Sequence, residues 1–546
     1  MGEVVRYFNN ALYVLLITFF SIPPFYGQSD DLTQAIWAKY GCGTVPYPSN
    51  TGTKSPNPII VSPKVWSFVS EPNLHPMKVT VTTHKPGTSS GFVLVAPYGF
   101  SANAMYGQPG SLVLDNEGNP VWFRPLASPN LMNTDFRVQQ LNGQPVLTFW
   151  QGTLASPPTY TNAPAGSSEP GSCYYILDNT YRIIKKVSAQ KGFTSDIHEF
   201  LLTPRNTALL LSTKTVKADL TPYGGPQNGY VQDFAIQEID LNTNELLFFW
   251  DALEHIPLAD SYEPASTARS TNNIWDAYHC NAIGLTDSSD DILLSGRNLW
   301  TIYRIHKPTQ AIVWRLGGKQ SDFTIGAGAN FSWQHDARFL PGNVISMFDD
   351  NCCESFTIPP GTPFAHGLIL QLDLVGMTAT LKESYYHDPN IQVSSQGNVQ
   401  SLGNGNKFIG WGQSQYYSEY RAPGNTVHTP ALNVLYDATM PTNNYTYRAY
   451  RYNWVGMPYY PPSIAVQRNN GQITVYASWN GSTETTAWQV YAGVCPYKLT
   501  KIITANKIGF ETALPVNNTG PYFQVMALDA EDQVIGASKT IKFCER

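Results

Sequence analysis

Residues 240–250 read DLNTNELLFFW, a polar turn followed by an apolar run that ends in tryptophan. Asp and Asn hydrogen-bond their own backbone in tight turns, and the apolar run has the composition of a β-strand. Four more segments repeat the arrangement: 115–122 (DNEGNPVW), 178–184 (DNTYRII), 306–314 (HKPTQAIVW) and 373–381 (DLVGMTATL). The spacing is roughly 60 to 70 residues, longer than the forty-odd of a WD repeat. The fold is therefore a repeat of strand pairs.

A sixth unit extends from Gly397 to Trp454. Between about Val79 and Tyr452 the apolar residues alternate with a period of two, as strands require. Six units of four strands predict an all-β fold, a six-bladed β-propeller over residues 79–460 with long inserted loops. The tail, 461–546, alternates separately in 472–479 (QITVYASW) and 487–491 (AWQVY), which predicts an immunoglobulin- or fibronectin-like sandwich.

The amino-acid composition excludes several classes of protein. Of 546 residues, 42% are hydrophobic, 13% aromatic and only 14% charged, so the chain has material for a large core and is not disordered. The net charge of -6 argues against general nucleic-acid binding. No stretch after the N-terminus is apolar enough to span a bilayer, and no stable membrane insertion is expected.

The N-terminus predicts export. Residues 1–27 combine Arg6, an apolar run of about a dozen residues and two prolines, as in a secretory signal peptide, and the run is short of the roughly 20 residues of a membrane anchor. Residues 28–78 form an extension expected to pack on the propeller. Four sequons predict glycans at Asn330, Asn444, Asn480 and Asn517. Of seven cysteines, Cys495 and Cys544 lie alone in the tail and are predicted to pair there.

A second motif recurs where each propeller unit begins. It reads DIHE at 196–199, AYHCN at 277–281 and WQHD at 333–336, placing His198, His279 and His335 at equivalent positions. Equivalent positions in a propeller surround one axis, so these side chains should meet at one end of the central channel. Arg137 and Asn398 stand at the same point of the second and sixth units.

Several stretches resemble the arylsulfotransferase family, especially its secreted fungal-type branch. They are 278–281 (YHCN), 290–297 (DDILLSGR), 313–318 (VWRLGG), 334–338 (QHDAR), 347–350 (MFDD), 396–400 (QGNVQ) and 404–412 (NGNKFIGWG). The resemblance covers about 72–456. It implies a six-bladed propeller that transfers a sulfuryl group between phenols through a sulfated histidine, without a nucleotide donor. The resemblance implies that His279 and His335 occupy two of the family's catalytic positions. The segment 396–398 (QGN) fills the late-blade entry where the family has a further histidine.

The chemistry of sulfuryl transfer extends the candidate set. A transferase needs a nucleophilic imidazole, a proton shuttle and cations for the sulfate oxygens. The catalytic candidates are His198, His279, His335, Arg297 and Arg338. The substrate-binding candidates are Arg137, Asn281, His366 and Asn398. An aromatic or polyketide-like small molecule is the expected substrate, and no cofactor is expected.

Three alternatives stay open at this point. The same propeller without the sulfuryl acceptor could catalyse acid–base cyclisation or isomerisation of a natural product. It could also bind a ligand without catalysis. Three converging histidines could hold zinc or iron, but no short His-x-His or His-x-x-x-His spacing occurs, and no metal is predicted.

Overall fold

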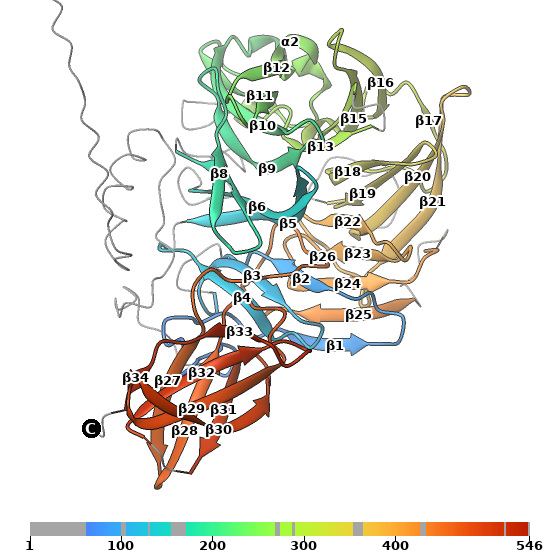
Figure 1. The fold of residues 1–546 in the computed structure, drawn as a ribbon. Helices are drawn as coiled ribbons and strands as arrows, with labels where there is room; N and C mark the ends of the chain where they lie inside the picture. The colour runs from blue at the N-terminus through green and yellow to red at the C-terminus, as the bar shows by residue number, and fades with distance from the viewer. Residues whose placement is uncertain are drawn as a thin grey trace, which may run out of the picture.

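The computed structural model describes residues 62–543, apart from 100–104, 129–130, 154–170, 268–273, 287–289, 353–363, 426–432 and 518–519. The predicted signal peptide lies outside this part, as do Cys544 and most of the N-terminal extension. The structure is all-β, as predicted (Figure 1). In the described residues the one α-helix is α2 (Ala252–His255). There are also four short 3₁₀ helices, η1 (Thr221–Tyr223), η2 (Leu258–Asp260), η3 (Ala265–Thr267) and η4 (Arg297–Leu299). None of the described helices has the length and apolar character needed to cross a membrane.

Six antiparallel sheets are built between Thr80 and Tyr452, and we number them in chain order of their second strand. Sheet one is β26 (Tyr450–Tyr452), β2 (Phe92–Val95), β3 (Gly110–Leu114) and β4 (Pro120–Pro125). Sheet two is β5 (Met132–Leu141), β6 (Gln144–Gly152), β7 (Cys173–Leu177) and β8 (Ile183–Val187). Sheet three is β9 (Thr194–Leu202), β10 (Thr207–Ala218), β11 (Gly229–Asp240) and β12 (Leu246–Asp251).

Sheet four is β13 (Cys280–Leu285), β14 (Asp291–Gly296), β15 (Thr301–His306) and β16 (Ala311–Gly317). Sheet five is β18 (His335–Leu340), β19 (Val344–Asp349), β20 (His366–Asp373) and β21 (Thr378–Tyr386), with β17 (Thr324–Ile325) added in parallel to β21. Sheet six is β22 (Asn398–Ser401), β23 (Lys407–Gly410), β24 (Tyr416–Tyr420) and β25 (Val434–Thr439), with β1 (Thr80–His84) outermost. Each of the five polar turns identified in the sequence joins the third and fourth strands of a sheet.

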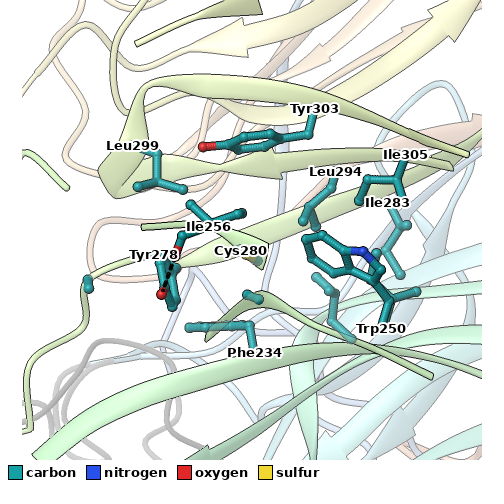
Figure 2. Packing of buried hydrophobic residues seen from close by; sticks show 14 of the residues in the cluster. Phe234, Trp250, Ile256, Tyr278, Cys280, Ile283, Leu294, Leu299, Tyr303 and Ile305 are labelled. Atoms are coloured by element: carbon teal, nitrogen blue, oxygen red, sulfur yellow. Dashed lines mark hydrogen bonds between the residues drawn. The ribbon is translucent and has the colours of Figure 1, made fainter. Parts of the chain in front are cut away.

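The sheets are buried on both faces, because alternate residues of each strand enter two different cores. In β10, Leu209 and Leu211 face sheet four while Ala208 and Leu210 face sheet two. Figure 2 shows the first of these cores, where Trp250 and Phe234 of sheet three pack on Ile283 and Leu294 of sheet four. Six such cores join sheets one to two, two to three, three to four, four to five, five to six and six to one.

Two further sheets form the tail, shown in red in Figure 1. One is β27 (Ser463–Asn469), β28 (Gln472–Ser478) and β31 (Glu511–Val516). The other is β30 (Lys498–Asn506), β29 (Ala487–Cys495), β32 (Tyr522–Leu528), β33 (Val534–Ala537) and β34 (Ile541–Lys542). One core, with Trp479, Trp488 and Phe523, joins them.

The tail is fixed to the rest of the chain by buried polar contacts. The Asn480 side chain accepts from Phe123 N at 2.8 Å and donates to Phe123 O at 2.9 Å. The Ser463 hydroxyl donates to Glu71 at 2.5 Å, and Glu511 accepts from the Ser70 backbone and hydroxyl, both at 2.5 Å. Each is a hydrogen bond shielded from water, so the attachment has a defined geometry.

Two of the predicted glycosylation sites are wrong for the folded chain. Asn480 is buried in the contact just described, and Asn444 is fully buried with Nδ2 donating to Tyr106 O at 2.8 Å. A glycan on either nitrogen would replace the hydrogen bond and has no room. Asn330 and Asn517 are exposed, so glycosylation at these two residues stays a prediction. Cys495 is exposed with a free thiol. Its predicted partner Cys544 lies outside the described residues, so the pairing stays a prediction.

Candidate functional site

The site lies where the inner strands of sheets two to five begin. Each of these strands carries a β-bulge at the same level: at Asp135 and Phe136 in β5, at 196–199 in β9, at Asn281 in β13 and at Asp336 and Ala337 in β18. Bulges re-aim side chains and are common beside active sites. Asp135, His279 and Asp336 have φ of 50°, 46° and 54°, a left-handed conformation uncommon outside glycine.

These bulges bring the three predicted histidines together. The His198 and His279 rings are 5.0 Å apart between centroids, and those of His279 and His335 are 6.5 Å apart. All three side chains are nearly enclosed, with 1–3% of the residue surface exposed. The three histidines at equivalent repeat positions therefore lie close together, as the sequence predicts.

Each histidine is anchored by its own carboxylate through Nδ1. The partners are Asp196 for His198, Asp276 for His279 and Asp350 for His335, each with a nitrogen–oxygen distance of 2.5 Å. A carboxylate at Nδ1 holds the ring orientation and tautomer and stabilises positive charge that forms on the ring. The sequence analysis did not pick these aspartates, although Asp-x-His at 196–198 and Asp-x-x-His at 276–279 were visible signals.

Burial and neighbouring charge keep two of the rings neutral. Burial lowers the pKa of His279; Asp276 opposes this shift, and His198 and Arg297 add to it. Burial lowers the pKa of His335 well below the ordinary 6.5, and Arg297 is the next cause. A neutral imidazole can accept a proton or attack an electrophile at neutral pH.

His335 differs from the other two at its second nitrogen. The Gln396 backbone N–H donates to Nε2 of His335 at 3.2 Å. Nε2 is therefore the acceptor, and Nδ1 carries the proton that is donated to Asp350. In contrast, Nε2 of His198 and Nε2 of His279 have no hydrogen-bond partner among the residues described. The structure leaves these two nitrogens available for chemistry and occupies that of His335.

Arg297 supplies the cation beside the histidines. It begins η4 directly after β14, is half-buried, and donates to Asn298 Oδ1 and to Ser394 O, both at 2.9 Å. Its guanidinium lies 4.7 Å over the Trp333 ring. Trp300 packs edge-on against Trp333 at 5.6 Å and stacks on Tyr262 at 3.8 Å. A cation with aromatic walls fits a ligand that is both anionic and aromatic.

Arg338, predicted to be catalytic, and Arg137, predicted to bind substrate, both form ion pairs with buried carboxylates. Arg338 pairs with Asp336 at 2.5 Å and with Glu199 at 2.7 Å, and Arg137 pairs with Glu199 at 2.5 Å and with Asp135 at 3.0 Å. Arg448 completes a network of three arginines and three carboxylates by reaching all three acids, at 2.8–3.4 Å. Both predicted arginines are therefore paired with buried carboxylates that hold them at the inner strands, and they are not available to a sulfate group.

The remaining predicted binding residues also have structural partners. Asn281 donates to Gln334 O at 2.8 Å, and Asn398 exchanges two hydrogen bonds with the Ala449 backbone at 2.8 and 2.9 Å. Both side chains tie neighbouring inner strands together. His366 stacks on Tyr386 at 4.7 Å with Nε2 3.7 Å from Asp349, and the structure places it beside these residues instead of among the three histidines.

Tyr447 is the main residue that the sequence analysis missed. Its ring packs edge-on against His198 at 5.6 Å and against His335 at 6.4 Å, and it is buried. It precedes β26, which forms the inner edge of sheet one by pairing with β2, some 350 residues earlier in the chain. That pairing, which local sequence cannot reveal, is what brings Tyr447 to the same level as the histidines. Within the described residues, no group of three side chains is arranged to hold a metal ion.

Comparison with known proteins gives the family of the chain. No curated protein matches the chain. Solved structures with a similar chain path include a protein of unknown function from Bacteroides caccae (11% identity, 64% of this chain and 94% of that one, TM-score 0.35). Others are the periplasmic gluconolactonase of Pseudomonas aeruginosa (10%, 70% and 94%, TM-score 0.27) and TolB from Acinetobacter baumannii (10%, 67% and 68%, TM-score 0.31). The arylsulfotransferase (ASST) family model matches residues 137–432, which include the three histidines and Arg297. The chain belongs to the arylsulfotransferase family.

Proposed function

We propose that the six sheets close into a six-bladed β-propeller and that residues 461–546 form a β-sandwich. The inner strands contact one another in the order β5, β9, β13, β18 and β22, and β26 contacts β5. The six cores likewise join every sheet to the next and the sixth to the first. This order is what a ring of blades requires.

The protein acts, in this proposal, as an arylsulfotransferase-like enzyme on an aromatic small molecule. The observation that carries it is the meeting of three histidines, each with an Nδ1 carboxylate, beside a cation with aromatic walls. His279 Nε2 attacks the sulfur of an aryl sulfate, so the N–S bond forms as the S–O bond to the aryl oxygen breaks. Asp276 stabilises the positive charge on the ring. The first aryl group leaves as an aryloxide. A phenol then attacks the sulfur, losing its proton to the His198 imidazole as its oxygen takes the sulfuryl group and the N–S bond breaks.

The assignment to His279 follows from the nitrogen contacts. His335 could attack only after losing the Gln396 N–H at Nε2, whereas Nε2 of His279 is available. We assign His335 a positioning role, in which its ring contacts the substrate and the neighbouring side chains without attacking the sulfur. His198, with Nε2 available and its ring 5.0 Å from His279, is the proton-transfer partner.

A second candidate is acid–base chemistry on a natural product without sulfate. The ion network supports it, because Arg338 and Arg137 are paired with carboxylates in that network, and Arg297 donates hydrogen bonds to Asn298 and Ser394. Imidazoles anchored at Nδ1 are competent general acids and bases. The third candidate is a propeller that binds a ligand without catalysis, and the experiment must distinguish it from the two enzyme forms.

Export to the secretory pathway is part of the proposal. The N-terminal sequence motivates it, and the exposed sequon residues Asn330 and Asn517 are compatible with it. The expected partners are small aromatic molecules.

The test is incubation of the purified protein with 4-nitrophenyl sulfate and phenol. Transfer is read as phenyl sulfate formed, and mass spectrometry of donor-treated protein reads an added sulfuryl group. His279→Ala should lose the adduct and His335→Ala should keep it. His387→Gln is the control, because His387 is equally buried but packs on Trp411 and Tyr416 in another core.

Unmodified protein that forms no phenyl sulfate would reject sulfuryl transfer. If the natural substrate is still turned over, and His279→Ala costs about 10²–10⁴ in rate, the acid–base form is supported. Full turnover by the Ala variants would leave only ligand binding.

A further inference from the structure

The Tyr447 hydroxyl is a polar group at the site for which the described residues provide no hydrogen-bond partner. The side chain is buried, and its oxygen has no hydrogen-bond partner. A buried donor without a partner carries a desolvation penalty, and such a group in a native structure calls for a specific explanation. Its place between two of the three histidines points to a ligand as the missing partner.

We propose that the Tyr447 hydroxyl donates a hydrogen bond to the aryl oxygen of the substrate, the oxygen that bears or receives the transferred group. The inference rests on the proposed function in one respect, that the ligand is a phenol or its ester. It adds a binding residue that the sequence did not reveal and that the three histidines do not supply.

The surroundings of Tyr447 fix it as a donor. Burial raises the pKa of its hydroxyl well above the ordinary 10.0, so it keeps its proton at any working pH. It therefore donates to an aryloxide or ether oxygen and does not act as a base. Negative charge that develops on the aryl oxygen as the S–O bond breaks would strengthen this hydrogen bond.

The backbone holds the residue in place. Tyr447 O accepts from Gly397 N at 3.1 Å, and the next residue, Arg448, is locked in the ion network. The Arg448 guanidinium lies 5.0 Å from the centre of the Tyr447 ring. A ring held on two sides in this way presents its hydroxyl at a defined position, as substrate orientation requires.

The chain provides a matched control. Tyr417 is also buried with an unpartnered hydroxyl, but it packs against Tyr436 and Phe408 in the core between sheets six and one. Tyr417→Phe removes the same atom from a different place. A loss caused by removing any buried hydroxyl would appear in both variants.

The experiment compares the full-length protein with Tyr447→Phe and Tyr417→Phe. Binding of phenol and of 4-nitrophenol is measured by calorimetry, and the melting temperature reports folding. We expect Tyr447→Phe to weaken phenol binding about tenfold, the effect of about 1.4 kcal/mol, with a melting temperature no lower than that of wild type. Tyr417→Phe should leave the affinity unchanged. Equal affinities in Tyr447→Phe and wild type, or an equal loss in both variants, would overturn the inference.

A second arm uses aryl sulfates of different leaving groups. Loss of the donor should cost more with phenyl sulfate, whose phenol is about as basic as a tyrosine at pKa ≈ 10, than with the better leaving group of 4-nitrophenyl sulfate. An equal cost for both donors would contradict the assignment to the aryl oxygen. Phenol binding that depends on Tyr447 without any sulfuryl transfer would uphold Tyr447 and reject the proposed transferase. An absence of phenol binding to wild type would reject both.

Discussion

His279 has a φ of 46° and Nδ1 2.5 Å from Asp276, and these two facts explain its chemistry together. The left-handed backbone at the start of β13 turns the imidazole toward His198, and the aspartate keeps Nδ1 engaged so that Nε2 is the reactive atom. The histidine repeat in the sequence identified the residue, but not the nitrogen. The nitrogen is set by contacts such as that of Gln396 with His335, which come from a different sheet.

The pH dependence of the site follows from the pKa of His279. Burial lowers this pKa more than Asp276 raises it, and the charges of His198 and Arg297 lower it further, so the ring stays neutral as the pH falls through 6.5 and activity should persist there. Arg297→Gln removes one cause, so the His279 pKa should rise and the acid limb of the rate profile should move to higher pH. NMR titration of the histidine ring protons checks this without relying on turnover.

Arg315→Gln is the control for this titration, because Arg315 is partly exposed and pairs with Asp322 on the surface. A His279 pKa that is the same in Arg297→Gln and wild type would contradict the electrostatic role.

At the scale of elements, the sequence predicted the outer strand pairs and the starts of several inner strands, but not the contacts between the inner strands. The polar turns from 115–122 to 373–381 mark outer strand pairs because turn formation is local. The ion network joins Asp135, Glu199 and Asp336, from three different inner strands, to Arg448, which precedes β26. The local sequence could not reveal that Arg137 and Arg338 pair within this network. Long-range pairing, not local propensity, decided their role.

Removing one member of the ion network should lower the free energy of unfolding. Glu199→Gln leaves three arginines facing two carboxylates, and we expect a loss of about 3–5 kcal/mol in the free energy of unfolding, the usual effect of removing one buried partner. Urea denaturation measures it. Glu254→Gln, on the exposed face of α2, should change stability by no more than about 0.5 kcal/mol.

Acid should have a related effect. Burial would raise the pKa of Glu199, but Arg338, Arg448 and Arg137 hold it at about 2. The stability that this ionised group contributes is present above its ordinary value of 4.5 and is lost as the pH falls toward 2. The stability difference between wild type and Glu199→Gln should therefore shrink in that window, and a constant difference would contradict the assignment.

For the whole molecule, the tail is the part whose attachment responds to pH. Glu71, which accepts from Ser463, has its pKa raised by burial to about 7. The stability of this contact is full below the ordinary value of 4.5 and falls as the pH rises through 7. Glu71→Gln keeps an acceptor without the charge. It should raise the melting temperature at pH 8 and leave it nearly unchanged at pH 4.5; calorimetry at both values decides.

Glycan occupancy tests the same attachment. Peptide mass spectrometry of protein made in a eukaryotic secretory host should find glycans at Asn330 and Asn517 and none at Asn444 or Asn480. A glycan at Asn480 would show that the hydrogen bonds to Phe123 are not formed.

The pairing of β26 with β2 sets the order in which this molecule can be completed. A ribosome releases the residues of β2 long before Tyr450–Tyr452 exist, so sheet one keeps an open inner edge until most of the chain has been made. The same late strand brings Tyr447 and Arg448. A prematurely ended chain would therefore lack both the inner strand of sheet one and the tyrosine beside the histidines, so that only finished molecules could acquire activity.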